Sequence, residues 1–74
     1  MKLTVKLLAY FRDNRFVAEV QEYPSSHTVK DIVTDLGIDP EEVGVLMINS
    51  RKCKFETVPK ENDILAIFPV IGGG

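Results

Sequence analysis

The residues best suited to chemistry are three consecutive glycines, Gly72, Gly73 and Gly74, at the end of the 74-residue sequence. Because glycine has no Cβ, a glycine arm can enter a narrow site and adopt backbone angles that other residues avoid. Such an arm would present the α-carboxylate of Gly74 as the reacting group. The alternative is a frayed chain end, since the ends of most domains are poorly ordered.

Other reactive side chains are scarce. The sequence holds one cysteine, Cys53, and one histidine, His27. A single cysteine cannot form an internal disulfide, and these two residues alone cannot build a zinc or iron–sulfur site. We therefore expect no metal site and no bound cofactor. Cys53 is expected to be an ordinary strand or turn residue, and His27 a solvated loop residue before a helix.

Length and composition indicate one small globular domain, with 45% hydrophobic and 27% charged residues. The net charge of −2 gives no general attraction to nucleic acid. No apolar run approaches the roughly 20 residues that span a bilayer. Residues 1–6 mix charged with apolar side chains, unlike a signal peptide. We expect a cytoplasmic protein with neither a nucleic acid nor a membrane partner.

Apolar residues at every second position predict a strand over 3–11 with one buried face. The polar residues 12–15 suit a turn, and alternation resumes in the next segment with Phe16, Ala18 and Val20 on one side. Two strands joined by a polar turn predict a hairpin. Its apolar face is the expected partner of a helix.

Thr28 begins the main predicted helix, with Asp31 three residues on as in a capping box. Gly37 is placed to end this helix in a left-handed conformation. Between them, apolar residues recur at helical spacing and form one stripe. They are Val29, Ile32, Val33 and Leu36.

The second half of the sequence predicts a short helical turn at 39–42, a buried strand at 45–48 and a short strand near 52–55. Residues 64–68 are continuously apolar, which predicts a central strand covered on both faces. This order, with the first and last strands as neighbours, predicts an α+β fold, the ubiquitin-like β-grasp. Its mixed sheet packs on one main helix, over residues 1–69, followed by a flexible glycine tail at 70–74.

Three segments, 45–51, 59–63 and 66–74, together resemble the sulfur-carrier family of ubiquitin-like proteins. That family includes the small subunit of molybdopterin synthase and the sulfur carrier of thiamine biosynthesis. Residues 1–12 and the Phe68–Pro69 pair are closer to the molybdopterin branch. The glycine ending and the short helix are closer to the thiamine branch.

The resemblance implies that the chain is a protein co-substrate and not an enzyme. In the family, a ubiquitin-activating-enzyme-like adenylyltransferase uses ATP and magnesium to adenylate the terminal glycine, and sulfur then replaces AMP to give a thiocarboxylate. Carried over, Gly74 is the modified residue, behind a tail of Gly73, Gly72, Ile71 and Val70. The next partner would be a molybdopterin synthase large subunit, which we favour, or a thiazole synthase.

Alternation along the last strand places Leu65 and Ile67 toward the helix, and Ile64, Ala66 and Phe68 on the opposite face. An exposed aromatic side chain near a functional tail is a typical binding anchor. We therefore expect partner contacts from Phe68, Pro69, Ala66 and Met47. The alternative is that these are ordinary apolar surface positions, which are common on small proteins.

Two further functions stay open. A ubiquitin-like protein modifier would use the same activated Gly74 to link itself to lysines of other proteins. A plain β-grasp binding module would carry an inert tail. An enzyme activity of its own is not expected, because the sequence shows no paired carboxylates and no nucleophile with its own base. Nor do the glycines precede the helix that a phosphate-binding loop requires.

Overall fold

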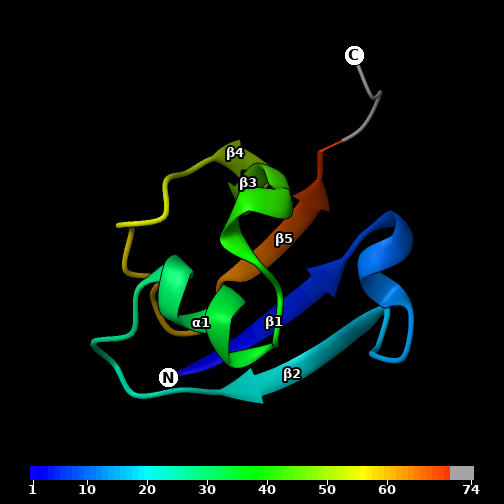
Figure 1. Cartoon of the computed structure of the whole chain (residues 1–74). Coiled ribbons are helices and arrows are strands. Elements are labelled where there is room, and N and C mark those ends of the chain that lie inside the picture. Colours follow the sequence, from blue (N-terminus) through cyan, green and yellow to red (C-terminus); the bar gives the residue numbers. More distant parts are fainter. Residues whose placement is uncertain (71–74) are drawn as a thin grey trace.

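The computed structural model describes residues 1–70, which form a mixed sheet with one main helix on one face (Figure 1). In chain order the elements are β1 (Lys2–Leu7), the 3₁₀ turn η1 (Ala9–Arg12), β2 (Ala18–Glu22), α1 (Val29–Asp35), the 3₁₀ turn η2 (Pro40–Glu42), β3 (Val43–Ile48), β4 (Arg51–Lys52) and β5 (Ile64–Pro69). The strand order is β2-β1-β5-β3-β4. β1 and β5 are parallel, and the other neighbouring strands are antiparallel. The predicted α+β arrangement is confirmed.

The core lies between α1 and one face of the sheet. Alternate residues of β1 and β5 point to this side, and α1 covers them (Figure 1). The most deeply buried side chains are Leu3, Val5, Leu7, Val29, Ile32, Val33, Leu65 and Ile67. Burying each such side chain stabilises the fold by about 1.5–3 kcal/mol before entropy costs. In residues 1–70, no helix is long and apolar enough to cross a membrane.

The start and end signals of α1 are confirmed. The hydroxyl oxygen of Thr28 accepts a hydrogen bond from the Asp31 N–H at 3.2 Å, and the Asp31 carboxylate accepts one from the Thr28 N–H at 3.0 Å. Gly37 follows the helix with φ of +76°, in the left-handed region. A helix of 7 residues is marginal on its own, so packing on the sheet maintains it.

The first strand is shorter than predicted, because β1 ends at Leu7 and not at residue 11. Ala9 has φ of +52°, and the chain then turns through η1, where the Arg12 Nε donates to the carbonyl oxygen of Leu7 at 3.0 Å. Phe11 is nevertheless buried. The apolar alternation extends past the strand because the tight turn also returns Phe11 to the core.

The prediction of a buried apolar face on the second strand was wrong. In the pairing of β1 with β2, Val5 lies opposite Glu19 and Thr4 lies opposite Val20. Since opposite residues share a face, Glu19 lies on the helix side and Val20 on the other, where it is 66% exposed. Ala18 shares that open face, whereas Phe16 precedes the strand and packs half-buried against the core.

The prediction that the last strand is covered on both faces was also wrong. Within β5, Leu65 and Ile67 are completely buried, whereas Ile64 is 40% exposed. On β3, Leu46 is buried and Val45 is 37% exposed. Within residues 1–70, the five-stranded sheet carries one helical layer and leaves one face uncovered. Because both faces carry apolar residues, the strand sequence is one continuous apolar run.

Candidate functional site

The uncovered face of the sheet brings three of the four predicted contact residues together. Ala66 of β5 lies opposite Met47 of β3, and Phe68 lies opposite Val45. On the other side of β5, Ala66 pairs with Lys6 of β1. Because opposite residues share a face, these side chains form adjacent rows across three strands. We call this surface the open face.

A shallow hollow of about 250 Å³ lies on the open face. It is lined by Lys6, Leu8, Met47, Asn49, Ser50, Ile64, Ala66 and Phe68. Sequence reasoning missed Lys6 and Leu8, because they belong to the first strand and its exit. The parallel pairing of β1 with β5 brings them beside Ala66, and no local pattern specifies that register.

Pro69 is the fourth predicted contact residue, and the structure places it apart from the other three. It follows the alternation of Leu65 and Ile67 and is buried on the helix side. Its backbone pairs with Val43 at the end of β3. The open face as described therefore does not include its side chain.

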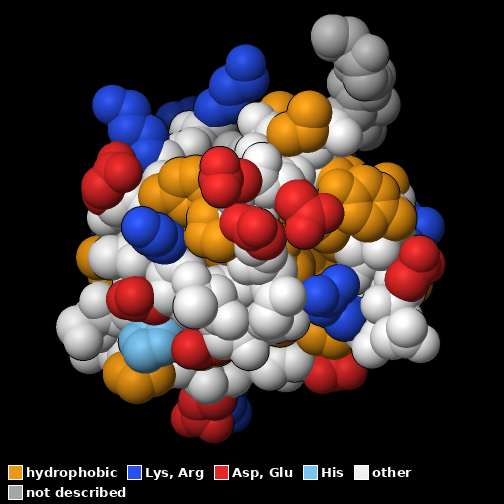
Figure 2. Space-filling model, in the orientation of Figure 1, with side chains coloured by type: hydrophobic (Ala, Val, Ile, Leu, Met, Phe, Trp, Pro, Cys, Tyr) orange, Lys and Arg blue, Asp and Glu red, His pale blue; other side chains and the backbone are white. Residues whose placement is uncertain are grey.

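Basic side chains flank the apolar row of the open face. Lys6 lies at one end, beside Ala66, and Lys52 of β4 lies at the other, opposite Met47. The opposite side of the molecule differs, because Figure 2 shows acidic and basic side chains interspersed over the helix layer. An apolar row between two lysines suits a partner surface with apolar centre and acidic rim.

The end of β5 is held by the segment that precedes β3. The N–H of Val70 donates to the carbonyl oxygen of Glu42 at 2.9 Å, while the Val70 side chain is 58% exposed. The remaining predicted tail residues, Ile71, Gly72, Gly73 and Gly74, lie outside the described residues. The modified residue and the tail boundary at 70 therefore stay predictions.

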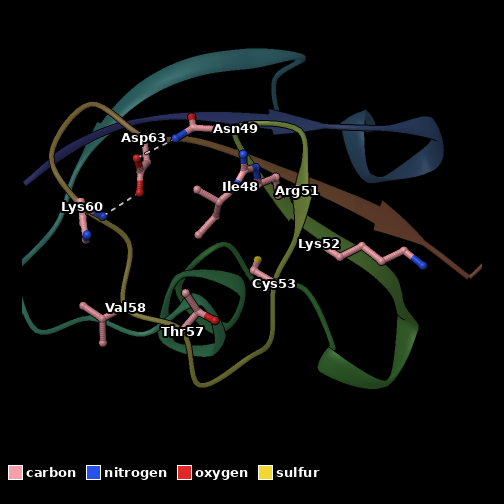
Figure 3. A pocket seen from close by; sticks show the side chains of 9 residues that line it. All are labelled: Ile48, Asn49, Arg51, Lys52, Cys53, Thr57, Val58, Lys60 and Asp63. Carbon is pink, nitrogen blue, oxygen red and sulfur yellow. Dashed lines mark hydrogen bonds between the residues drawn. The ribbon is translucent and has the colours of Figure 1, made fainter.

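A second, larger hollow of about 550 Å³ opens between the β3–β4 turn and the loop that leads to β5 (Figure 3). Figure 3 shows the Asp63 carboxylate at one side of it, where its oxygens accept from the Asn49 side-chain amide at 2.9 Å and the Lys60 N–H at 2.8 Å. The side-chain Oδ1 of Asn49 in turn accepts from the Ile64 N–H at 2.9 Å. These bonds fix the loop against β5, which is a structural role.

Cys53 lines the same hollow, and burial raises the pKa of its thiol. A raised pKa keeps the thiol protonated and poorly nucleophilic, which agrees with the expected structural role.

His27 lies in the loop before α1, as predicted, but it is half-buried. Its Nε2 lies 2.9 Å from an Asp35 carboxylate oxygen, and its ring stacks on Tyr23. Within residues 1–70, no group of three or more potential metal ligands converges.

Solved structures with the same fold come from archaea and bacteria. A Pyrococcus furiosus protein assigned as molybdopterin converting factor, subunit 1, superposes with a TM-score of 0.79 at 22% identity, covering 96% of this chain and 99% of that one. SAMP1 of Haloferax volcanii superposes with a TM-score of 0.75 at 18% sequence identity, and the match covers 100% of both chains. A third match is to the Helicobacter pylori complex of subunits 1 and 2 of molybdopterin-converting factor. Its TM-score is 0.67 at 15% sequence identity, and the match covers 100% of both chains.

Likeness at these identities establishes the fold, and the predicted β-grasp is confirmed. No curated protein sequence matches the chain. The family comparison is more specific, because the ThiS family model matches residues 5–74. That match begins within β1 and continues through the open face to the glycine ending. The chain therefore belongs to the ThiS family, a family of ubiquitin-like sulfur carriers.

Proposed function

We propose that this protein is a sulfur carrier whose C-terminal glycine, Gly74, is adenylated and then converted to a thiocarboxylate. The match to the ThiS family over residues 5–74 carries this proposal, because it includes both the domain and the glycine ending. In this role the chain is a co-substrate, and a partner supplies the catalytic groups.

The proposed chemistry has two steps. A carboxylate oxygen of Gly74 attacks the α-phosphorus of ATP, and pyrophosphate leaves. The resulting acyl-adenylate has a good leaving group, which a free carboxylate lacks. Hydrosulfide, or a donor that supplies sulfur at the same oxidation level, then attacks the acyl carbon, and AMP leaves. The resulting thioacid loses its proton to give the thiocarboxylate. ATP and magnesium would be held by a ubiquitin-activating-enzyme-like adenylyltransferase.

The fixed position of Val70 limits where that partner can hold ATP. Gly74 lies four positions beyond Val70, and an extended chain of four residues spans at most about 14 Å. Docking must therefore occur close to the end of β5. The open face fulfils this requirement, because Phe68 of β5 lies only two residues before Val70, which directly follows the strand.

Phe68, Ala66 and Met47 are the proposed contacts on the open face, because they lie together and are only half-buried. The sulfur acceptor that we favour is a molybdopterin synthase large subunit, for which this chain would be the small subunit. The resemblance of residues 1–12 and of Phe68–Pro69 to that branch supports this choice. Thiazole synthase, the acceptor in thiamine biosynthesis, is the next candidate.

A second candidate function is protein modification through Gly74. The observation that favours it is the likeness to SAMP1 and to a second H. volcanii structure described as small archaeal modifier protein 1. Purification of an affinity-tagged chain from the organism that encodes it distinguishes protein modification from sulfur transfer. Conjugates of high mass that survive denaturation and reduction would support modification. Recovery of a molybdopterin synthase large subunit or a thiazole synthase would support sulfur transfer and identify the branch.

The adenylation step is tested by ATP–pyrophosphate exchange with the activating enzyme of the same organism. The wild type should support exchange, and Gly74→Ala should abolish it, because the added methyl group lies where the chain must be thinnest. Circular dichroism should show the same fold for both proteins. Exchange by Gly74→Ala at the wild-type rate would contradict the assigned reaction site.

A further inference from the structure

The strand beside β5 contains an irregularity close to the start of the tail. Val43 pairs with Pro69 and Val45 pairs with Phe68, so Gly44 is an extra residue in β3 at a bulge. Bulges in strands are specific features that redirect the chain. This one lies against the last described residues of the chain.

Gly44 allows the two backbones to approach unusually closely. A Cβ built on Gly44 would lie 2.8 Å from the carbonyl oxygen of Pro69 and 3.0 Å from the Cα of Val70. Both are main-chain atoms, so no side-chain rotation could relieve the clash. The φ of Gly44 lies outside the left-handed region, so space and not conformation requires the glycine.

Glu42, two residues before Gly44, holds the chain at Val70, directly after β5. The Glu42 carbonyl oxygen accepts from the Val70 N–H at 2.9 Å, and the Glu42 carboxylate accepts from the Tyr10 hydroxyl at 3.1 Å. Residues 42–44 thus contact Pro69 and Val70 through a hydrogen bond and through direct backbone packing. Residues 42–44 therefore fix the position at which the chain leaves the sheet after Pro69.

We propose that Gly44 is a positioning residue for the reactive C-terminus, because it lets residues 42–44 hold Pro69 and Val70 at a fixed place beside the open face. This inference rests on the proposed function, in which Gly74 must reach ATP on a partner docked at that face. Any larger residue at 44 displaces the start of the tail relative to Phe68. A misplacement of about 1 Å can cost about 100-fold in rate.

Gly44→Ala is the test variant, and Gly37→Ala is its matched control. An Ala at 37 is strained because φ there is +76°, but the added Cβ would meet nothing nearer than the Arg15 Nη2 at 3.9 Å. Both substitutions add one methyl group and both are expected to lower the melting temperature. Gly44→Ala alone should disturb the end of β5.

The first readout is amide hydrogen exchange at Val70, which does not depend on any partner. In the wild type and in Gly37→Ala this amide should be protected by its bond to Glu42. In Gly44→Ala its exchange should become at least about 10-fold faster, while amides in the middle of β5 stay protected. Unchanged exchange at Val70 would overturn the proposal.

The second readout is adenylation kinetics with the activating enzyme. Because the open face is unchanged, KM should stay within about 2-fold for Gly44→Ala, whereas kcat should fall at least about 10-fold. Gly37→Ala should keep both constants near the wild-type values. A wild-type kcat for Gly44→Ala, or equal losses in both variants, would contradict a positioning role.

A second variant covers the case in which Gly44→Ala does not fold. Val70→Pro removes the N–H that bonds Glu42 and leaves Gly44 unchanged, and its ring Cδ takes the place of that hydrogen and presses on the Glu42 carbonyl oxygen. It should stay folded and lower kcat several-fold with little change in KM, and an unchanged kcat would contradict the proposal. If the wild type itself is not adenylated, the proposed function fails. Hydrogen exchange then still decides whether Gly44 fixes Val70.

Discussion

The two faces of β5 are similar in hydrophobicity and opposite in environment. Leu65 and Ile67 are completely buried beneath α1, whereas their neighbour Ile64 is 40% exposed and Phe68 is half-buried on the open face. Both faces carry apolar side chains on one strand. The covered face accounts for folding, and an apolar surface left uncovered beside the proposed reactive end is suited to a partner.

The largest effect should follow from a substitution on the covered face. Ile67→Ala leaves a cavity in the core beside its paired neighbours Leu7 and Leu46, and should lower the free energy of unfolding by about 2–5 kcal/mol. This is a large part of the roughly 5–15 kcal/mol that stabilises a small domain. Urea unfolding followed by circular dichroism measures it. A loss similar to that of a surface substitution would contradict the assignment of Ile67 to the core.

A smaller effect on stability, with a clear effect on binding, should follow on the open face. Phe68→Ala should cost about 1 kcal/mol of unfolding free energy, because the ring is only half-buried. The Kd for the large-subunit partner should rise at least about 10-fold if Phe68 is an anchor. Isothermal titration calorimetry measures the Kd directly.

Val20→Ala is the control for this experiment. Val20 lies on the same face and is 66% exposed, but it belongs to the edge strand β2 and is outside the hollow. The Kd of Val20→Ala for the same partner should equal that of the wild type. Equal weakening by both substitutions would mean that the open face has no localised anchor, and an unchanged Kd for Phe68→Ala would leave Phe68 a structural residue.

The smallest effect concerns the cap of the helix that covers the core. The backbone and side-chain hydrogen bonds of Thr28 lower the pKa of the Asp31 carboxyl below its ordinary value. A lowered folded-state pKa stabilises the fold above the unfolded-state pKa of about 3.9, and this contribution is lost as the pH falls through the folded-state value. Asp31→Asn should therefore flatten the acid limb of melting temperature against pH. Identical curves for both proteins would contradict the contribution of the cap.

Local signals predicted the helix correctly because its determinants are close in sequence. The capping pair Thr28 and Asp31 and the left-handed Gly37 are recognisable within ten residues, and all three are confirmed. Alternation along the last strand likewise separated Leu65 and Ile67 from their neighbours. These features depend on chemistry within one element.

The features that were missed depend on pairing between distant segments. Lys6 joins the open face because β1 runs parallel to β5, and Val20 faces away from the helix because of its register with Thr4. The bulge at Gly44 follows from its closeness to Pro69, 25 positions further along the sequence. A single sequence carries no signal for such registers, and the pairing of β1 with β5 is what adds Lys6 and Leu8 to the candidate docking surface.

The central claim is that sulfur is carried on Gly74. The direct test is mass spectrometry of the protein after reaction with its activating enzyme, ATP, magnesium and a sulfur source. The spectrum should show the mass increase for replacement of one oxygen by sulfur, located by fragmentation on Gly74 and missing in Gly74→Ala. Sulfur found on Cys53, or gained equally by Gly74→Ala, would contradict it.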